Sequence, residues 1–434
     1  MLDANAITKM QSLILAAIIT VAAVAGVALY YVWTNNTGTS NTIKIGVLAD
    51  LDAVGQWQAA VLAAEQINAE GGILGRQVEI IGEDLDPQSQ DIVTYTNALE
   101  RLLTFHKIDF IIGSTTDQLG FIVQDKCAEN KKIFFAMGAS ADELTQRVID
   151  DYDKAKYFFR MGWNASSGYQ GATDGFLTLS MISDLKKVAL LTVDLPTAKG
   201  QIDALAQSLH ETYGYEIVYK DTFPLGTMDF TSYFAKAEAA GAEILVPWVL
   251  YQEGIAMVKE WYDRQSPMIM YSGINLAISD SEGWNATDGK CEDVAVSMTP
   301  IIADYPFTSK TLATREAFQQ RWDEPITWVS AMAYDVMRFI LPDAIERAGT
   351  TETEAVIKTL ETTNIETSQA PNFVFTSNHD AMMGKNPNDP DANYMIVMVF
   401  QWQNGTLVPI HPQKIMEAAG ATFTYPDWPG PWSK

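Results

Sequence analysis

The sequence predicts an α/β protein with two lobes, each built on a doubly wound parallel sheet, preceded by an N-terminal membrane-spanning helix. Three observations lead to this prediction. The chain has 434 residues, more than one hydrophobic core usually supports. From Ile43 onward, short apolar runs alternate with amphipathic stretches, which is typical of parallel sheets covered by helices on both faces. Residues 12–33 form an apolar run without a charge.

Two successive series of four apolar runs are expected to be strands. They are residues 43–49, 78–82, 110–113, 133–137, 188–193, 216–220, 244–248 and 268–271. The stretches between them have helical periodicity; Ile202, Leu205 and Leu209, for example, recur on one helical face. Two such series predict two doubly wound lobes.

The last third of the chain has a different pattern. Residues 326–349 are typical of one long amphipathic helix, and Thr351 with Glu354 predicts a capping box for the helix that follows. Asn404-Gly405 lies between apolar runs and predicts a β-hairpin. Residues 413–434 are expected to form a C-terminal tail without regular structure at its end.

The N-terminal apolar run is expected to cross a membrane. At ~1.5 Å per residue it is long enough for a ~30 Å hydrocarbon core, with residues 1–11 as a cytoplasmic N-terminus. Lys9 precedes the run and no basic residue follows before Lys44, which places the body outside the cell. A cleaved signal peptide ending near Ala25 is the alternative. Residues 34–42 are a small polar linker, flexible by composition.

Composition excludes several classes of function. There are 29 Lys and Arg residues against 54 Asp and Glu residues, a formal charge of −25, so nucleic acid is not an expected partner. Neither G-x-G-x-x-G after the first strand nor a P-loop occurs, and no cofactor is expected. Cys127 and Cys291 form no metal or redox motif, and they are expected to be either two buried thiols or one disulfide.

Several stretches together resemble a known family. They are "IKIGVLADL", "AAEQINAEGGILGRQVEII", "DFIIGSTTDQ", "KKIFFAMGASADELT", "YFFRMG", "KKVALLTVDLPTAKG" and "YDVMRFILPDAIERAG". In this order they resemble the type I periplasmic binding fold, specifically the solute-binding proteins of branched-chain amino acid ABC transporters. The resemblance covers Ile43 to about Pro412, and "INAEGGILGR" is its most specific part.

The resemblance implies two lobes joined by three crossovers. Residues 43–162 with 300–366 would form the first lobe, and residues 163–299 with 367–412 the second. A small-molecule ligand would bind between the lobes, and their closure would be recognised by an ABC transporter permease. This agrees with the general rule that ligands bind at the carboxyl ends of strands in open α/β sheets.

Candidate ligand-binding residues follow from the strand ends. Hydroxyl and backbone N–H groups after the strands at 110–113 and 133–137 occupy positions that bind a ligand carboxylate in the family. Aromatic residues in neighbouring segments predict an apolar or cation–π lining. The candidates are Asp52, Trp57, Ser114, Thr115, Thr116, Ala139, Ser140, Trp163, Thr197, Trp248, Tyr251 and Asn275.

The chain departs from the family pattern at two positions. In "DLPTAKG", Thr197 replaces the tyrosine that covers the ligand in amino-acid binders. In "MYSGINLA", Gly273 stands where an acid would clamp the ligand's ammonium group, and only Asn275 is close by. Glu253 is a substitute for that acid, although a solvated acid at a helix start is the simpler interpretation. An ammonium buried without a counter-charge would be costly, so a standard α-amino acid fits this chain less well than the family resemblance implies.

The sequence thus predicts an extracellular, membrane-tethered solute-binding protein of an ABC importer, without enzymatic activity. The alternative is a ligand-sensing ectodomain or regulator on the same fold that does not transport. Asn378-His379-Asp380 is the one trio that suggests catalysis, but no nucleophile elbow accompanies it, and a hairpin loop is the simpler interpretation.

Overall fold

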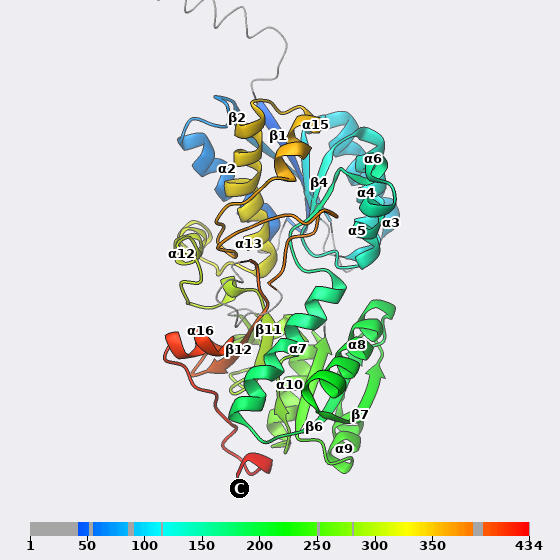
Figure 1. Cartoon of the computed structure of the whole chain (residues 1–434), viewed down its shortest axis with the longest axis vertical. Coiled ribbons are helices and arrows are strands. Elements are labelled where there is room, and N and C mark those ends of the chain that lie inside the picture. The colour runs from blue at the N-terminus through cyan, green and yellow to red at the C-terminus, as the bar shows by residue number, and fades with distance from the viewer. Residues whose placement is uncertain are drawn as a thin grey trace, which may run out of the picture. The chain divides into compact units, whose positions relative to one another are not determined.

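The computed structural model describes residues 42–51, 55–85, 91–113, 116–249, 252–279, 282–384 and 394–433. Residues 43–434 form one compact unit (Figure 1). Residues 1–41, which include the expected cytoplasmic N-terminus and anchor, lie outside the described residues. Among the residues that the structure describes, no helix combines the length and apolarity needed to cross a bilayer.

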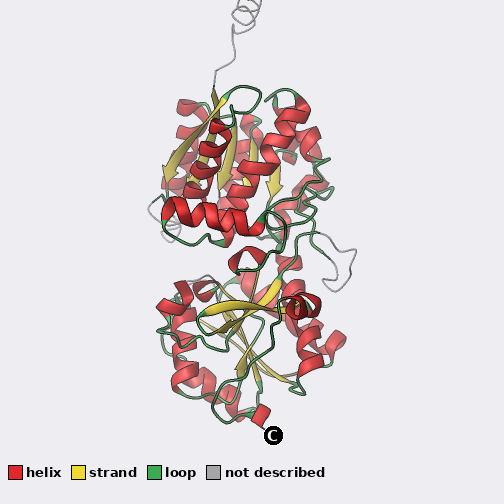
Figure 2. Cartoon of the chain, turned by 90° about the vertical axis from the view of Figure 1, so that its left-hand side faces the viewer, coloured by secondary structure: helices red, strands yellow, loops and turns green. Residues whose placement is uncertain are grey.

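The first sheet is parallel and five-stranded, in the order β2-β1-β3-β4-β5. Its strands are β1 (Thr42–Ala49), β2 (Gln77–Asp84), β3 (Phe110–Gly113), β4 (Ile133–Ala136) and β5 (Phe158–Arg160). Helices cover both of its faces, as Figure 2 shows. They are α2 (Gln56–Ala69), α3 (Ile92–Glu100), α4 (Asp117–Asn130), α5 (Asp142–Asp150) and the short α6 (Tyr152–Ala155). The direction in which successive strands are added reverses between β1 and β3. A ligand is expected at the carboxyl ends of these two strands.

The alternation of strand side chains builds two hydrophobic clusters, one on each face of this sheet. Ile112 belongs to one cluster and its neighbour Ile111 to the other, because successive side chains of a strand point to opposite faces. Cys127 and Cys291 are buried free thiols in different clusters. The disulfide that the sequence leaves open is therefore not formed in this structure.

The second sheet has the order β10-β8-β6-β7, with β9 also paired to β8. Its strands are β6 (Lys187–Val193), β7 (Glu216–Phe223), β8 (Ile244–Val249), β9 (Ile269–Met270) and β10 (Ile274–Asn275). The accompanying helices are α7 (Ala165–Ile182), α8 (Pro196–Tyr213), α9 (Thr231–Ala239), α10 (Glu253–Asp263) and α11 (Glu282–Ala286). All eight predicted strands are thus present, whereas β5 and β10 were not predicted as strands.

The third sheet is antiparallel and consists of β11 (Ala295–Met298), β12 (Met398–Gln403) and β13 (Thr406–His411). The hairpin predicted at Asn404-Gly405 is confirmed, with Gln403 paired to Thr406 across a two-residue turn. Helix α16 (Gln413–Ala418) follows, and Trp428 of the tail is buried against Trp261. The tail is therefore anchored to the helix layer of the second sheet.

The long helix predicted at 326–349 is present as three consecutive segments. They are α13 (Trp328–Asp335), a π-helical turn (Val336–Ile340) and α14 (Leu341–Ala348). Pro342 supplies no backbone N–H, so the hydrogen-bond ladder is interrupted there. Helix α12 (Thr311–Trp322) precedes α13, and both pack against α2 of the first sheet.

The predicted Thr351–Glu354 capping box is not formed. Helix α15 (Thr353–Leu360) begins after Glu352, whose carboxylate accepts a hydrogen bond from the N–H of Ala355. The hydroxyl of Thr351 accepts instead from the guanidinium of Arg76.

A segment beyond Glu366 pairs with the edge strand of the first sheet. Arg160 at the end of β5 forms a parallel bridge to Asp380, and within the segment Phe375 pairs with Ala381. Residues 379–381 therefore add a short pairing to the edge of the first sheet, because the free edge of β5 accepts another segment.

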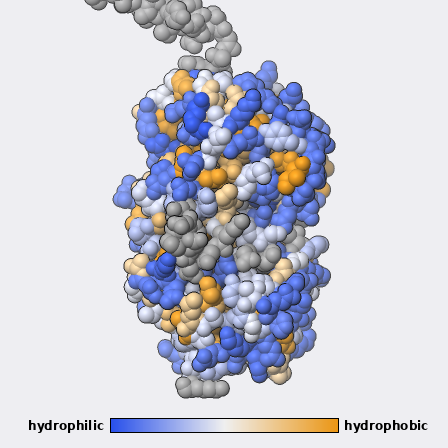
Figure 3. All heavy atoms as spheres, in the orientation of Figure 1, coloured by the Kyte–Doolittle hydropathy of each residue, from blue (hydrophilic) through white to orange (hydrophobic). Residues whose placement is uncertain are grey.

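The surface in Figure 3 is mostly hydrophilic, with hydrophobic residues in small separate patches, in keeping with the high negative charge.

Candidate ligand-binding site

Two loops at the carboxyl edge of the first sheet are joined by hydrogen bonds to one carboxylate. Asp117 is the first residue of α4, directly after Thr116, and the loop after β4 carries Ser140 and Ala141. Oδ1 of Asp117 accepts from the backbone N–H groups of Ser140 at 2.6 Å and Ala141 at 2.8 Å, and the Ser140 hydroxyl lies 3.5 Å away. The structure thus brings together Thr116 and Ser140, two predicted candidates, around an acid that was not predicted.

Arg160 at the end of β5 binds the backbone carbonyls of the same loop. Its side chain has almost no exposed surface, and its terminal nitrogens donate to the carbonyl oxygens of Ser140 at 2.6 Å and Ala141 at 2.7 Å. Its Nε forms an ion pair with Asp380 at 3.0 Å. Because the N–H groups of this loop bind Asp117 while its carbonyls bind Arg160, the loop has a fixed conformation before any ligand arrives.

Asp380 connects this loop to the segment that begins α7. Its Oδ2 accepts from the side chains of Thr145 at 3.1 Å and Asn164 at 2.9 Å, and Asn164 is the N-cap of α7. Burial raises the pKa of Asp380, and the neighbouring guanidinium of Arg160 opposes that shift. The buried guanidinium of Arg160 and the buried carboxylate of Asp380 thus form an ion pair, and this pair holds the loop and the start of α7 in place.

The trio Asn378-His379-Asp380 belongs to this network: the side-chain amide of Asn378 donates to the carboxylate of Asp380 at 3.1 Å, and His379 has other partners. His379 contacts the carbonyl oxygen of Phe158 through Nδ1 and the carboxylate of Glu361 through Nε2, at 2.9 and 3.1 Å. Burial lowers the pKa of His379. His379 and Asp380 hold the segment against β5, and Asn378 bonds within the segment, so the geometry supports the loop interpretation over a catalytic one.

At the carboxyl edge of the second sheet, three residues singled out from the sequence are buried. Trp248 in β8 has no exposed surface, and its indole N–H donates to the side chain of Gln201 at 2.9 Å. Asn275 at the end of β10 is equally buried and donates to the carbonyl oxygen of Gly254. Glu253 is not solvated, in contrast to the simpler interpretation above: it is 4% exposed and accepts from the N–H of Gly226.

Two other predicted aromatic residues are partly exposed. Trp57 on α2 lies against Gly82 of β2, where any side chain at residue 82 would collide with its ring. Trp163, between β5 and α7, stacks on Trp328 at the start of α13 with ring centroids 5.2 Å apart. Ala139 is buried beside the Ser140 loop.

The remaining candidates cannot be placed from the structure. Asp52, Ser114, Thr115 and Tyr251 lie outside the described residues, as does the side chain of Thr197. Within the described ranges, no group of three or more His, Cys, Asp or Glu side chains is arranged to hold a metal ion.

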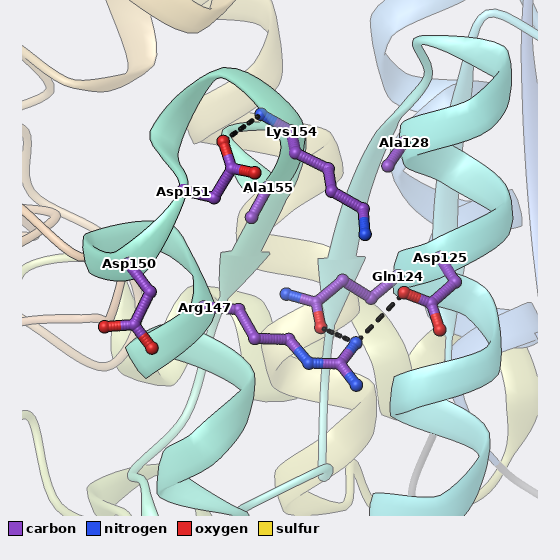
Figure 4. A pocket seen from close by; sticks show the side chains of 8 residues that line it. All are labelled: Gln124, Asp125, Ala128, Arg147, Asp150, Asp151, Lys154 and Ala155. Atoms are coloured by element: carbon purple, nitrogen blue, oxygen red, sulfur yellow. Dashed lines mark hydrogen bonds and ion pairs between the residues drawn. The ribbon is translucent and has the colours of Figure 1, made fainter.

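A surface pocket of about 330 Å³ lies elsewhere, between α4, α5 and α6 (Figure 4). Within it, the guanidinium of Arg147 donates to the side chains of Gln124 at 3.1 Å and Asp125 at 3.0 Å. None of its lining residues belongs to the strand-end loops of the first sheet.

Sequence reasoning did not identify Asp117 or Arg160. An acid in the first turn of a helix is ordinarily explained by the helix dipole, so Asp117 gave no separate signal. Arg160 did carry a signal, because a charge inside the apolar stretch "YFFRMG" must be paired when buried.

The comparisons agree with this architecture. A family model described as periplasmic binding protein matches residues 42–398. A Leu/Ile/Val-binding protein homolog 3 of Brucella melitensis is 25% identical over 323 residues, covering 73% of this chain and 82% of the relative.

Two solved structures are similar in fold. One is the branched-chain amino acid transporter substrate-binding protein LivJ of Streptococcus pneumoniae in complex with isoleucine: its TM-score is 0.67 at 20% identity, with 84% of this chain and 97% of that chain covered. The other is a solute-binding protein of an ABC transporter from R. palustris in complex with benzoate: its TM-score is 0.66 at 13% identity, with 85% and 95% covered. With a type I periplasmic binding fold and a family match over most of its length, the chain belongs to the periplasmic binding protein family.

Proposed function

We propose that this chain is the solute-binding component of an ABC importer and that it binds a small polar organic molecule between two lobes. The observation that supports this most directly is the rigid loop at Ser140, which lies beside Thr116 at the carboxyl edge of the first sheet. Open α/β sheets bind ligands at this edge, next to the point where strand order reverses. The family match is consistent with such a role.

The proposed lobes follow the expected division, with one change. Residues 43–162 and 300–366 form the first lobe, to which the segment reaching Asp380 is added because it pairs with β5. Residues 163–299 and the hairpin up to 412 form the second lobe. Ligand binding would close the lobes as a hinge movement, and the closed form would be the one that a permease recognises.

The proposed location is outside the cytoplasm, with residues 12–33 as a membrane anchor and residues 34–42 as a tether. A family of periplasmic binding proteins supports the location of the body. The apolar length of the N-terminal run supports the anchor. A binding protein held at the membrane stays close to its permease, which raises the effective concentration of the two partners.

The ligand class is the open part of this proposal. The relatives bear names for leucine, isoleucine and valine binding, and the solved structures hold isoleucine or benzoate. Amino acids, their amides, amines and aromatic acids are therefore the compounds to screen. A ligand at a hundredfold its dissociation constant should stabilise the protein by about 2.7 kcal/mol, visible as a raised Tm. If no compound of these classes raises the Tm, the proposal is wrong.

Variants at the strand ends test where the ligand binds. We expect Thr116→Ala and Ser140→Ala to weaken binding about tenfold each, as the loss of one hydrogen bond to a polar ligand does, with the Tm of the unliganded protein nearly unchanged. Ser180→Ala is the matched control, because that exposed hydroxyl donates to the carbonyl of Leu177 within its own helix. Equal affinities in all three variants would place the ligand elsewhere.

A further inference from the structure

The donors at the Ser140 loop are already bound to an anion that belongs to the protein. The N–H groups of Ser140 and Ala141 converge on Oδ1 of Asp117 at 2.6 and 2.8 Å, just before the first turn of α5. Backbone N–H groups at the start of a helix are the groups that bind a ligand carboxylate or phosphate in many proteins. In this chain the carboxylate of Asp117 occupies that position.

The cation nearest to this loop is likewise committed. Arg160 uses its terminal nitrogens for the carbonyls of Ser140 and Ala141 and its Nε for Asp380. Asp142, the first residue of α5, brings a second negative charge and accepts from the N–H and hydroxyl of Ser166. A ligand carboxylate approaching the loop would meet the negative charge of Asp117, whereas the guanidinium of Arg160 already bonds to the carbonyls of the loop and to Asp380.

A second, independent observation concerns buried acceptors. Oε1 of Gln56, the first residue of α2 after the loop that follows β1, is buried and has no hydrogen-bond partner within the described part of the chain. The same holds, over the described ranges, for Oδ1 of Asn275 at the end of β10. A buried acceptor without a donor is costly, and a ligand that carries N–H groups would supply one.

We propose that Asp117 makes this site select a ligand that presents a cationic or neutral N–H group at the Ser140 loop, such as an ammonium or a primary amide, and that it rejects a free carboxylate at that position. This inference rests on the proposed function and narrows its ligand class. The formal charge of −25 acts in the same direction, because it draws cations toward the protein and repels anions.

The test uses pairs of ligands that differ only in this group: leucine and leucinamide, benzoate and benzamide. Affinities are measured by isothermal titration calorimetry on the full chain in detergent. We expect the amide of at least one pair to bind about tenfold or more tightly than its carboxylate. In Asp117→Asn we expect that preference to fall by about tenfold, because the amide oxygen of Asn can still accept from the two N–H groups while the charge is gone.

Asp125→Asn is the matched control. It removes the same charge from the same helix at an exposed position paired with Arg147, and its ligand preference should equal that of the wild type. The order of the wild-type affinities for the four compounds tests the inference even if Asp117→Asn does not fold. Tighter binding of both carboxylates by the wild type overturns the inference and leaves the proposed function standing. Binding of none of the four compounds, nor of any compound in the wider screen, overturns both.

Discussion

At the scale of single residues, Asp335 is a buried ionisable group outside the candidate site. It is the last residue of α13, is 1% exposed, and accepts from the N–H of Ser368 at 3.0 Å and from the side chain of Gln369 at 3.4 Å. Burial raises its pKa to about 6. Asp335 interacts electrostatically with Lys310, whose ammonium donates to the carbonyl of Glu366 and which also interacts with Arg338.

This shift predicts a dependence of stability on pH. Because the pKa of Asp335 is higher in the folded than in the unfolded protein, its favourable contribution is complete below pH 4 and is lost as the pH rises through about 6. The lost contribution is about 3 kcal/mol for a shift of this size. Asp335→Asn should therefore gain about 3 kcal/mol relative to the wild type between pH 4 and pH 7, measured by urea unfolding at both values.

The control for Asp335→Asn is Asp153→Asn, since the side chain of Asp153 is 93% exposed. That variant should differ from the wild type by the same small amount at both pH values. A constant difference between Asp335→Asn and the wild type across this range would show that Asp335 does not titrate there.

One simple rule predicts from the sequence where Thr116 and Ser140 lie: residues after parallel strands gather at one edge of the sheet. In the structure Asp117, which follows Thr116, is bonded to Ser140, and the part of these residues in ligand binding stays a prediction. Asp117 and Arg160 were not found, because their roles depend on which loops become neighbours. The buried position of Trp248 could not be inferred either, since an aromatic residue at a strand end packs inward or outward according to the helix beside it.

At the scale of elements, the long periodic segments and eight strands were predicted from the sequence, and three short strands were not. The hairpin of β12 and β13 was identified from Asn404-Gly405, and the long helix from its periodicity. Although β3, β4 and β9 were predicted at similar lengths, β5, β10 and β11, of three, two and four residues, were not. They exist because neighbouring strands offer unpaired edges, which is a tertiary effect.

Substitution of one glycine in the hairpin turn and of another within α8 should have opposite effects on stability. Gly405 has φ of 78°, and a Cβ there would lie 3.3 Å from the ring of Trp284, so Gly405→Ala should cost about 1–2 kcal/mol. Gly200 lies within α8, where a Cβ would meet no atom within 4 Å, so Gly200→Ala should stabilise the protein by about 0.5–1 kcal/mol. Urea unfolding measures both, and changes of the same sign would contradict the explanation from backbone conformation.

At the scale of the whole molecule, residues 43–434 are expected to fold without the N-terminal segment. They form one compact unit, and the buried core begins at Ile43 itself. Deleting residues 1–42 should give a folded protein that does not aggregate and whose Tm lies within a few degrees of that of the full chain in detergent. Size-exclusion chromatography and circular dichroism measure this, and an aggregated product would contradict the tether that we propose.

The control is a deletion of residues 1–50, which also removes β1. Because β1 lies between β2 and β3, its loss leaves two buried strand edges unpaired, and this shorter body should not fold.

The pairing of β5 with the segment around Asp380 has a consequence for the order in which the protein is made. His379 contacts Phe158 across 221 residues of sequence, so a chain growing on the ribosome finishes the first sheet only after the whole second sheet has emerged. Until then β5 remains an open edge, and Arg160 lacks its buried counter-charge. We therefore expect the unfinished chain to be prone to aggregation. A chaperone that covers the edge of β5 would protect the chain between the synthesis of residue 160 and that of residue 380.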